Sequence, residues 1–205
     1  MTDRPTDAPP PAARPPRTDD EIRAAWVEPP PVLTAPIVLA EPDPAWPALY
    51  AREADRIQAA LGQRVIRIEH TGSTSVPGLA AKPIIDITMA VADVTDEEAW
   101  LPGLEAAGYR LVIREGEPDW YDHRCLKGPD TNVNLHTFSA GCPEVERMVG
   151  FQNWLRTHDD DRTLYEATKR ELASRDWQFV QNYADAKGEV VEGIARRAGL
   201  PGPHP

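Results

Sequence analysis

The chain has 205 residues, a hydrophobic content of 41% and a net charge of −11 at pH 7. This size and apolar content suffice for one folded domain plus an additional segment. The acidic excess excludes general nucleic-acid binding, because a negative surface repels the phosphate backbone, although a local basic pocket could hold one nucleotide.

The two cysteines, Cys125 and Cys142, lie 17 residues apart. Two cysteines at this spacing form neither a disulfide framework nor a structural zinc site, which needs four ligands at close pairwise spacing. No apolar run reaches the ~20 residues of a membrane span. The N-terminus lacks the apolar segment of a signal peptide. We therefore expect a cytoplasmic protein that makes no membrane contact.

A disordered, Pro-rich tail is predicted for residues 1–34, because this segment offers almost no side chains to bury. The apolar stretch Ile22–Val27 is long enough for one turn of helix, which the prolines at 29–31 would end. A polyproline ligand for a partner is the alternative interpretation of the tail. One domain is expected over residues 35–200.

Within the domain, extended and helical patterns alternate. β-Branched and aromatic residues predict strands at 37–40, 65–70, 83–91 and 109–113, and a hairpin of 121–127 with 132–138 across the turn sequence GPDT. Apolar spacing predicts helices over 43–61 and 96–107, and only helices from Pro143 onward, the last beginning near Asp176 and running through Ile194. This order predicts an α/β (α+β) fold: a mixed sheet flanked by helices, with a helical C-terminal part.

The loop after the second predicted strand is rich in glycine and hydroxyl residues: Gly72, Ser73, Thr74 and Ser75. Glycine lets the backbone approach a ligand closely, and backbone N–H groups with hydroxyls can hold an anionic oxygen. The spacing is not that of a Walker loop. A tight surface turn therefore remains an equal alternative to an anion site.

Asp86 interrupts the most apolar predicted strand. Because side chains alternate along a strand, Asp86 and Thr88 share one face, and Ile85 and Ile87 share the other. An ionised carboxylate in such surroundings is costly unless it is paired or binds a cation. Asp86 is therefore either the partner of a nearby Lys or Arg, or a metal-binding or acid/base carboxylate that faces the loop.

The stretch IEHTGSTSVPGLAAKPIIDITMAV resembles the hallmark segment of GrpB-family proteins. The segments PDPAWPALYAREADRIQAALG, HRCLKGPDTNVNLHTF, FQNWLRTHDDDRTLYEATKREL and NYADAKGEVV are similar to the same family in the same order, so the resemblance covers about residues 36–199. It implies a nucleotidyltransferase-like fold. In that superfamily a Gly-Ser pair precedes a strand with two carboxylates, which hold Mg²⁺ against the phosphates of a nucleotide.

By this resemblance Gly72-Ser73 is the pair and Asp86 the first carboxylate, but Thr88 stands at the second position. A threonine hydroxyl is a far poorer ligand for a hard dication than a carboxylate. Another acid would have to complete a Mg²⁺ site. The candidates are Glu69, Asp119 and Asp122, and we expect Asp86 and Glu69 as the metal ligands.

Further polar residues of the matching segments complete the expected site. The expected catalytic residues are Asp86, His70 and His136, and the expected phosphate or nucleotide ligands, beside the loop, are Lys82, Arg124, Lys127, Tyr183 and Lys187. By parity Arg124 and Lys127 lie on opposite faces of their strand. Structural roles remain open: a core histidine for His70, an exposed sheet face for His136, and a solvent-directed ammonium for Lys187.

Two functions follow from these expectations. The first is an enzyme for Mg²⁺-dependent transfer of a nucleotidyl group, or related phosphate-activating chemistry, on a small acceptor. The second is a non-catalytic module for a nucleotide- or CoA-related anion that has lost the second metal carboxylate. The occurrence of GrpB domains fused to dephospho-CoA kinase implies the CoA-related ligand by association alone.

Overall fold

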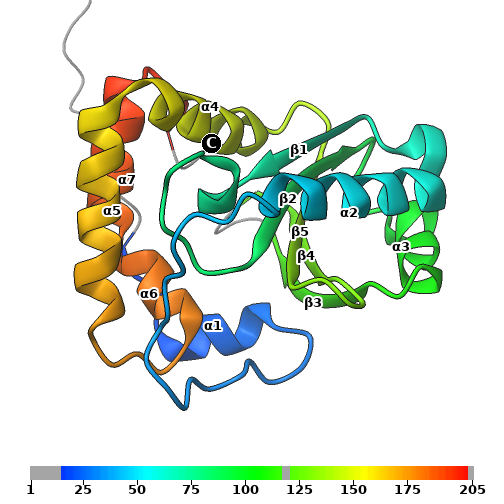
Figure 1. Cartoon of the computed structure of the whole chain (residues 1–205). Helices are drawn as coiled ribbons and strands as arrows, with labels where there is room; N and C mark the ends of the chain where they lie inside the picture. The colour runs from blue at the N-terminus through cyan, green and yellow to red at the C-terminus, as the bar shows by residue number, and fades with distance from the viewer. Residues whose placement is uncertain (1–14, 117–120, 203–205) are drawn as a thin grey trace, which may run out of the picture.

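A computed structural model describes residues 15–116 and 121–202 of the chain. Its centre is a five-stranded mixed sheet with the strand order β1-β2-β5-β4-β3 (Figure 1). The strands are β1 (Arg67–Thr71), β2 (Ile85–Val91), β3 (Arg110–Glu115), β4 (His123–Lys127) and β5 (Val133–Ser139). β2 and β5 pair in parallel and the other neighbours pair antiparallel. The predicted mixed sheet with flanking helices is confirmed.

One face of the sheet carries the main core. Helices α2 (Trp46–Leu61) and α3 (Glu97–Ala106) pack against it. Ile87 of β2 and Leu135 of β5 are fully buried there, as their alternation with polar residues predicts. The predicted helix over 43–61 begins after Asp43, whose carboxylate accepts a hydrogen bond from the Ala45 N–H at 2.8 Å.

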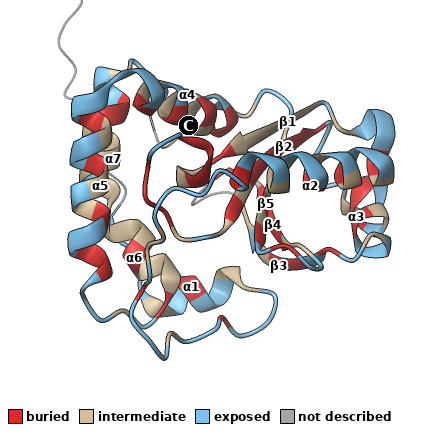
Figure 2. Cartoon of the chain, viewed as in Figure 1, coloured by how far each residue is buried: buried red, intermediate tan, exposed pale blue. Residues whose placement is uncertain are grey.

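The opposite face of the sheet, which carries Asp86 and His136, meets the helical C-terminal part. Its helices are α4 (Pro143–Thr157), α5 (Asp159–Ala173), α6 (Val180–Ala186) and α7 (Gly188–Arg197). The loop from the short 3₁₀ turn η2 (Ser73–Ser75) to β2 passes these helices and is largely buried there (Figure 2). Val76 and Leu79 of this loop form a small core with Leu155, Tyr165 and Ile194. Among the described residues, no helix is both long and apolar enough to cross a membrane.

Two predicted elements are wrong in their extent. Residues 37–40 form a single bridge, in which Ala40 and Ala81 exchange backbone hydrogen bonds of 2.8 and 3.0 Å. The next donors along this antiparallel ladder would be Pro42 and Pro83, which have no N–H, so no strand develops.

The predicted last helix is two helices, α6 and α7, separated at Lys187. It begins later than Asp176 because the Asn182 side chain caps the Phe179 N–H at 2.8 Å. Gly188, a poor helix former, follows the break. As a result Lys187 lies at a junction between helices, where its side chain reaches the sheet-facing side of both.

Part of the predicted disordered tail is folded. Helix α1 (Asp19–Ala25) begins with a capping box between Thr18 and Glu21, and Ile22 is only 1% exposed. The Val27 N–H donates to the Val112 carbonyl at 3.0 Å, which ties this segment to the edge strand β3. The expected disorder therefore does not apply to residues 18–27, where one apolar side chain finds a buried place. Residues 1–14 lie outside the described residues.

We expect Ile22→Ala to lower the free energy of unfolding by about 2 kcal/mol, the cost of a cavity at a buried aliphatic side chain. Because α1 is a short peripheral helix, amide hydrogen exchange should accelerate first in residues 18–27. The matched control is Val27→Ala, since Val27 is 47% exposed and its truncation should have little effect. Equal effects of the two substitutions would contradict the packing of α1.

Candidate functional site

A pocket of about 350 Å³ lies between the sheet and the C-terminal helices. Asp86, Asn134 and His136 line it from β2 and β5, and Ser73 and Thr74 line it from the loop. It brings together eight of the residues predicted from sequence: Gly72, Ser73, Thr74, Lys82, Asp86, His136, Tyr183 and Lys187. A concave site with several converging polar groups is the usual form of a ligand pocket.

Gly72 is a requirement of this geometry. Its φ of +66° lies in the left-handed region. A Cβ at this position would stand 2.2 Å from Oδ2 of Asp86, far inside van der Waals contact. The loop can thus approach the carboxylate only with glycine here. Ser75, in contrast, does not line the pocket: its hydroxyl is buried and hydrogen-bonds Gln152 of α4 at 2.9 Å.

Asp86 is held as a carboxylate by its neighbours. Its Oδ1 accepts a hydrogen bond from Asn134 at 2.7 Å and lies 3.8 Å from Nε2 of His136. Burial by itself raises the pKa of Asp86, but the neighbouring His136, the hydrogen bond from Asn134 and the charge of Lys82 outweigh it. The pKa therefore stays below its ordinary value, and Asp86 is ionised at neutral pH.

The residues around Asp86 do not fit a two-carboxylate Mg²⁺ site. Thr88 is fully buried, with its hydroxyl 2.8 Å from that of Thr71 and 3.5 Å from the Met148 sulfur. Glu69 stands opposite Thr88, pairs with Arg67 at 3.1 Å and lies outside the pocket lining. Asp122 does not line the pocket, and Asp119 lies outside the described residues. Residues 15–116 and 121–202 contain no group of three or more His, Cys, Asp or Glu side chains placed to bind a metal.

Lysines are concentrated at the pocket. The sequence contains four, and three of them, Lys82, Lys169 and Lys187, line it. Lys187 Nζ lies 4.7 Å from the ring centroid of Tyr183, and Lys169 Nζ lies 4.9 Å from that of Tyr165. Within the described part of the chain, every ion pair is made by an arginine or a histidine, so none of these lysines has a carboxylate partner.

The pKa values of two lysines reflect this crowding. Burial, together with the charge of Lys187, lowers the pKa of Lys169 to about 7. The same two causes, only partly offset by Asp86, lower the pKa of Lys82 to about 8. Three positive charges that share a pocket with one carboxylate, Asp86, are costly, and a bound anion would relieve that cost.

Tyr183 adds an unused donor to the pocket. The residue is 1% exposed, and no described residue hydrogen-bonds its buried hydroxyl. Buried hydroxyl groups without partners are rare in folded proteins.

The sequence prediction missed two residues of the pocket, Tyr165 and Lys169. Their spacing of four residues is the same as that of Tyr183 and Lys187, which was the signal available.

His70 contacts the loop from the core face of the sheet. In the register of the sheet it stands opposite Ile87, on the core face, and its ring stacks on Tyr50 with centroids 4.7 Å apart. Its Nε2 lies 3.1 Å from the Thr74 hydroxyl. Burial lowers the pKa of His70 to about 4, so the ring is neutral near pH 7. The structure therefore places this predicted catalytic residue outside the pocket.

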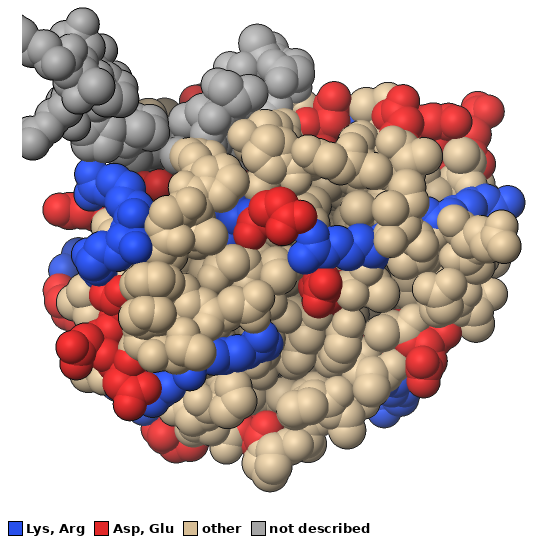
Figure 3. Space-filling model, turned by 90° about the horizontal axis from the view of Figure 1, so that it is seen from above, with Lys and Arg blue, Asp and Glu red and all other residues tan. Residues whose placement is uncertain are grey.

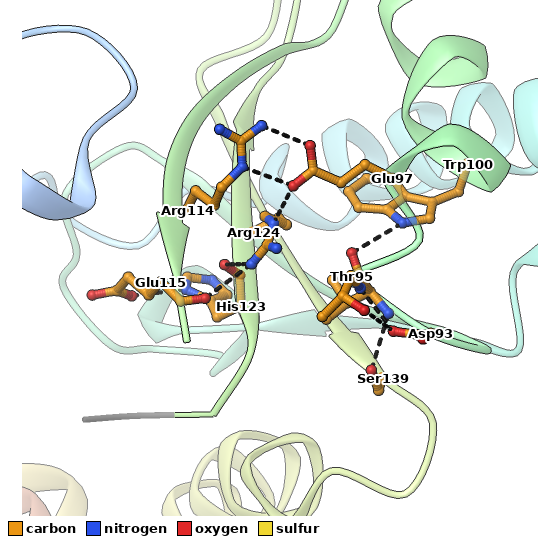
Figure 4. A network of polar contacts seen from close by, with 10 residues as sticks. Asp93, Thr95, Glu97, Trp100, Arg114, Glu115, His123, Arg124 and Ser139 are labelled. Carbon is orange, nitrogen blue, oxygen red and sulfur yellow. Dashed lines mark hydrogen bonds and ion pairs between the residues drawn. The ribbon is translucent and has the colours of Figure 1, made fainter. Parts of the chain in front are cut away.

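Arg124 does not line the pocket, and Figure 4 shows its side chain in contact with Glu97. It shares a face with Thr137 rather than with His136, and its Nε donates to Glu97 of α3 at 2.5 Å. Arg124 and Lys127 lie on opposite faces of the sheet, as parity predicts, and Arg124 lies on the core face. Lys127, on the pocket face, donates to Oδ1 of Asn134 at 2.5 Å and acts on Asp86 through that amide.

His136 belongs to a row of polar contacts across the sheet. Its Nδ1 lies 3.1 Å from Nε2 of His123, whose Nδ1 lies 2.9 Å from Glu115. Burial lowers the pKa of His123, so this ring favours the neutral form. The row fixes the orientation of His136 with Nε2 toward Asp86.

Figure 3 shows that, on the face seen from above, Lys and Arg side chains alternate with Asp and Glu side chains. No continuous basic surface forms on that face.

Comparison with known proteins identifies relatives over nearly the whole folded region. The family model described as GrpB protein matches residues 36–197. A UPF0157 protein of Halalkalibacterium halodurans is 51% identical over 183 residues, which cover 89% of this chain and 93% of the relative. A UPF0157 protein of Streptomyces coelicolor is 45% identical over 163 residues, covering 80% of this chain and 84% of the relative.

Two further matches concern a longer protein and a solved structure. A dephospho-CoA kinase of Mycolicibacterium paratuberculosis is 30% identical over 191 residues, covering 82% of this chain but 47% of the kinase. The crystal structure of the conserved protein GrpB from Enterococcus faecalis has a TM-score of 0.67 and 30% identity, and the match covers 78% of this chain and 96% of that chain. The chain therefore belongs to the GrpB protein family.

Proposed function

We propose that this chain binds a small phosphate-containing ligand, a nucleotide or a CoA-related compound, in the pocket between the Gly72–Thr74 loop and helices α5 and α6. The observation that carries the proposal is the convergence of Lys82, Lys169 and Lys187 on one pocket without a carboxylate partner among the described residues. A dianionic phosphate would neutralise most of this charge.

Other groups of the pocket suit a phosphate as well. The Tyr183 hydroxyl, buried and unpaired within the described structure, can donate to a phosphate oxygen. Ser73 lines the pocket beside Gly72, where hydroxyl and backbone donors favour an anion. The partial match to a dephospho-CoA kinase supports a CoA-related ligand, without transferring that protein's activity to this chain.

We do not assign Mg²⁺-dependent nucleotidyl transfer to this site, because Thr88 is enclosed and Asp86 has no second carboxylate beside it among the described residues. A second candidate function is metal-independent acid/base chemistry on the bound ligand. It is favoured by the 3.8 Å approach of His136 Nε2 to Asp86 and by the polar row that orients His136. His136 would exchange a proton with the ligand while the lysines hold its phosphate.

Calorimetric titration with ATP, CTP and CoA, each with and without Mg²⁺, tests the proposal. We expect at least one of them to bind without Mg²⁺, and Lys187→Met to weaken this binding by about tenfold or more, as the loss of a buried charge contact does. The matched control is Arg64→Met, which removes an exposed cation of the 3₁₀ turn after α2 and should not change the affinity.

Absence of binding by all three ligands would contradict the proposal. Binding that requires Mg²⁺ and is abolished by Asp86→Ala would instead support nucleotidyl transfer. These two outcomes differ in the metal dependence of the wild-type protein, so they can be distinguished before any variant is made.

A further inference from the structure

Asp86 is the single acid that lines this pocket among the described residues, and it stands against three lysines. Its Oδ1 is engaged by Asn134, whereas no described residue donates a hydrogen bond to Oδ2. Gly72 lets the loop lie directly against Oδ2, because any side chain at that position would overlap this oxygen. The Asp86 side chain is 27% exposed and lines the pocket.

A carboxylate is an unexpected group in a pocket for anions. A ligand made of phosphate alone would bring like charges together at Asp86 and lose affinity. A ligand that places a hydrogen-bond donor at Oδ2 would gain a charge-assisted hydrogen bond. The donor that fits is a neutral hydroxyl, because an ammonium group would meet the positive charges of Lys82, Lys169 and Lys187.

We propose that the pocket selects phosphate esters that also carry a hydroxyl group, and that Asp86 Oδ2 accepts the hydrogen bond of this hydroxyl while the lysines hold the phosphate. This inference rests on the phosphate binding proposed above and specifies its ligand class: polyol or sugar phosphates, including the ribose part of a nucleotide. Asp86 then determines specificity by direct contact with the ligand and not through a metal ion.

The geometry supports the two-part arrangement. Asp86 and His136 lie on the sheet, whereas Lys169 and Tyr183 approach from α5 and α6 on the opposite wall of the same pocket. A compact ester spans the two walls with its phosphate toward the helices and its hydroxyl toward the sheet. Asn134 holds the carboxylate in position through its 2.7 Å hydrogen bond.

The test compares glycerol 3-phosphate with n-propyl phosphate, which has the same chain length and charge but no hydroxyl, in calorimetric titrations without metal and with Mg²⁺. Pyrophosphate is titrated under the same conditions as a probe for phosphate binding alone. We expect the wild-type protein to bind glycerol 3-phosphate about tenfold more tightly, the effect of one hydrogen bond to a charged acceptor. Because this comparison uses the wild-type protein, it does not depend on the folding of a variant.

Asp86→Asn provides the second arm. The lost charge should raise the affinity for n-propyl phosphate severalfold and reduce the preference for glycerol 3-phosphate to about threefold or less. The matched control is Asp55→Asn, which removes an exposed charge from α2 and should leave both affinities unchanged. Thermal unfolding curves of the two variants establish that both are folded.

Each outcome has one meaning. Equal binding of the two esters to the wild-type protein, or a preference that survives Asp86→Asn, would overturn the role of Asp86 while phosphate binding stands. A preference that requires Mg²⁺ would also overturn it, since Asp86 would then act as a metal ligand. Absence of binding by both esters and by pyrophosphate would remove the phosphate site and this inference together.

Discussion

Raising the pH from 7 to 9 should weaken the binding of an alkyl phosphate by about two orders of magnitude, because two pocket lysines lose their protons in this range. The pKa of Lys169 is about 7 and that of Lys82 about 8 in the unliganded protein. A phosphate dianion binds their charged forms and raises both pKa values, so binding takes up protons. The ligand's own second ionisation lies near pH 6 and does not contribute above pH 7.

Calorimetry in two buffers of different ionisation enthalpy measures this proton uptake directly. In Lys169→Met, binding should take up one proton instead of two. The decrease in phosphate affinity from pH 7 to 9 should then be about tenfold, because Lys82 still loses its proton in this range. Arg64→Met is the matched control, because Arg64 is exposed and does not line the pocket, and its loss should leave the two-proton dependence in place. An affinity that is constant from pH 7 to 9 would contradict the assignment.

The stability of the unliganded protein should show the opposite trend. An unfolded lysine has its ordinary pKa of 10.5, above the folded values of Lys82 and Lys169. Between about pH 7 and 10.5 the unfolded chain therefore binds more protons than the folded protein, so these two groups make the free energy of unfolding rise with pH. Raising the pH therefore lowers the affinity for a phosphate and raises the free energy of unfolding, and both effects come from Lys82 and Lys169.

Gly72→Ala should be the most damaging small substitution in the loop, lowering the free energy of unfolding by about 3 kcal/mol and abolishing phosphate binding. Its φ of +66° disfavours any side chain, and the added Cβ would overlap Oδ2 and Cβ of Asp86 at 2.2 and 2.8 Å. Either the loop or the carboxylate must move, and both line the pocket. Chemical denaturation and calorimetric titration measure the two effects.

Gly78→Ala separates backbone strain from the overlap with Asp86. Gly78 has a similar φ of +77°, but nothing lies within 4 Å of the Cβ that it would carry. This substitution should cost only the positive-φ penalty of about 1–2 kcal/mol and leave ligand affinity intact. Equal losses for the two glycines would show that the approach of Gly72 to Asp86 is unimportant.

Local patterns predicted correctly which residues of β2 share a face. Alternation along β2 placed Asp86 and Thr88 on one face, and the register of the sheet confirms that both lie opposite the core residues Ile85 and Ile87. The glycine-rich loop was expected to face Asp86, and Gly72 does so. These features depend on neighbouring residues and on one adjacent strand, which is the range over which periodicity is informative.

The helical side of the site could not be predicted in the same way. In the sequence, Lys169 looks like a solvent-exposed lysine of an amphipathic helix. Its position in the pocket depends on the packing of α5 against a loop 89 residues away in the sequence, where Lys169 donates a hydrogen bond to the Ala80 carbonyl. Ile22 is a similar case, because a single apolar residue gives no periodic signal. For Arg124, parity gives the alternation with Lys127 and not the identity of the face that the C-terminal helices cover; His70 lies on the core face, which is the structural role left open for it.

The distribution of lysine has a practical consequence for chemical work on this protein. Apart from the N-terminal amine, the four lysines are its only primary amines, and three of them line one pocket. Two of these amines carry a substantial neutral fraction near pH 8 and are therefore nucleophilic. An acylating dye or a succinimidyl crosslinker should therefore modify Lys82 in the pocket as well as the N-terminal amine, and bound phosphate should protect Lys82 from it.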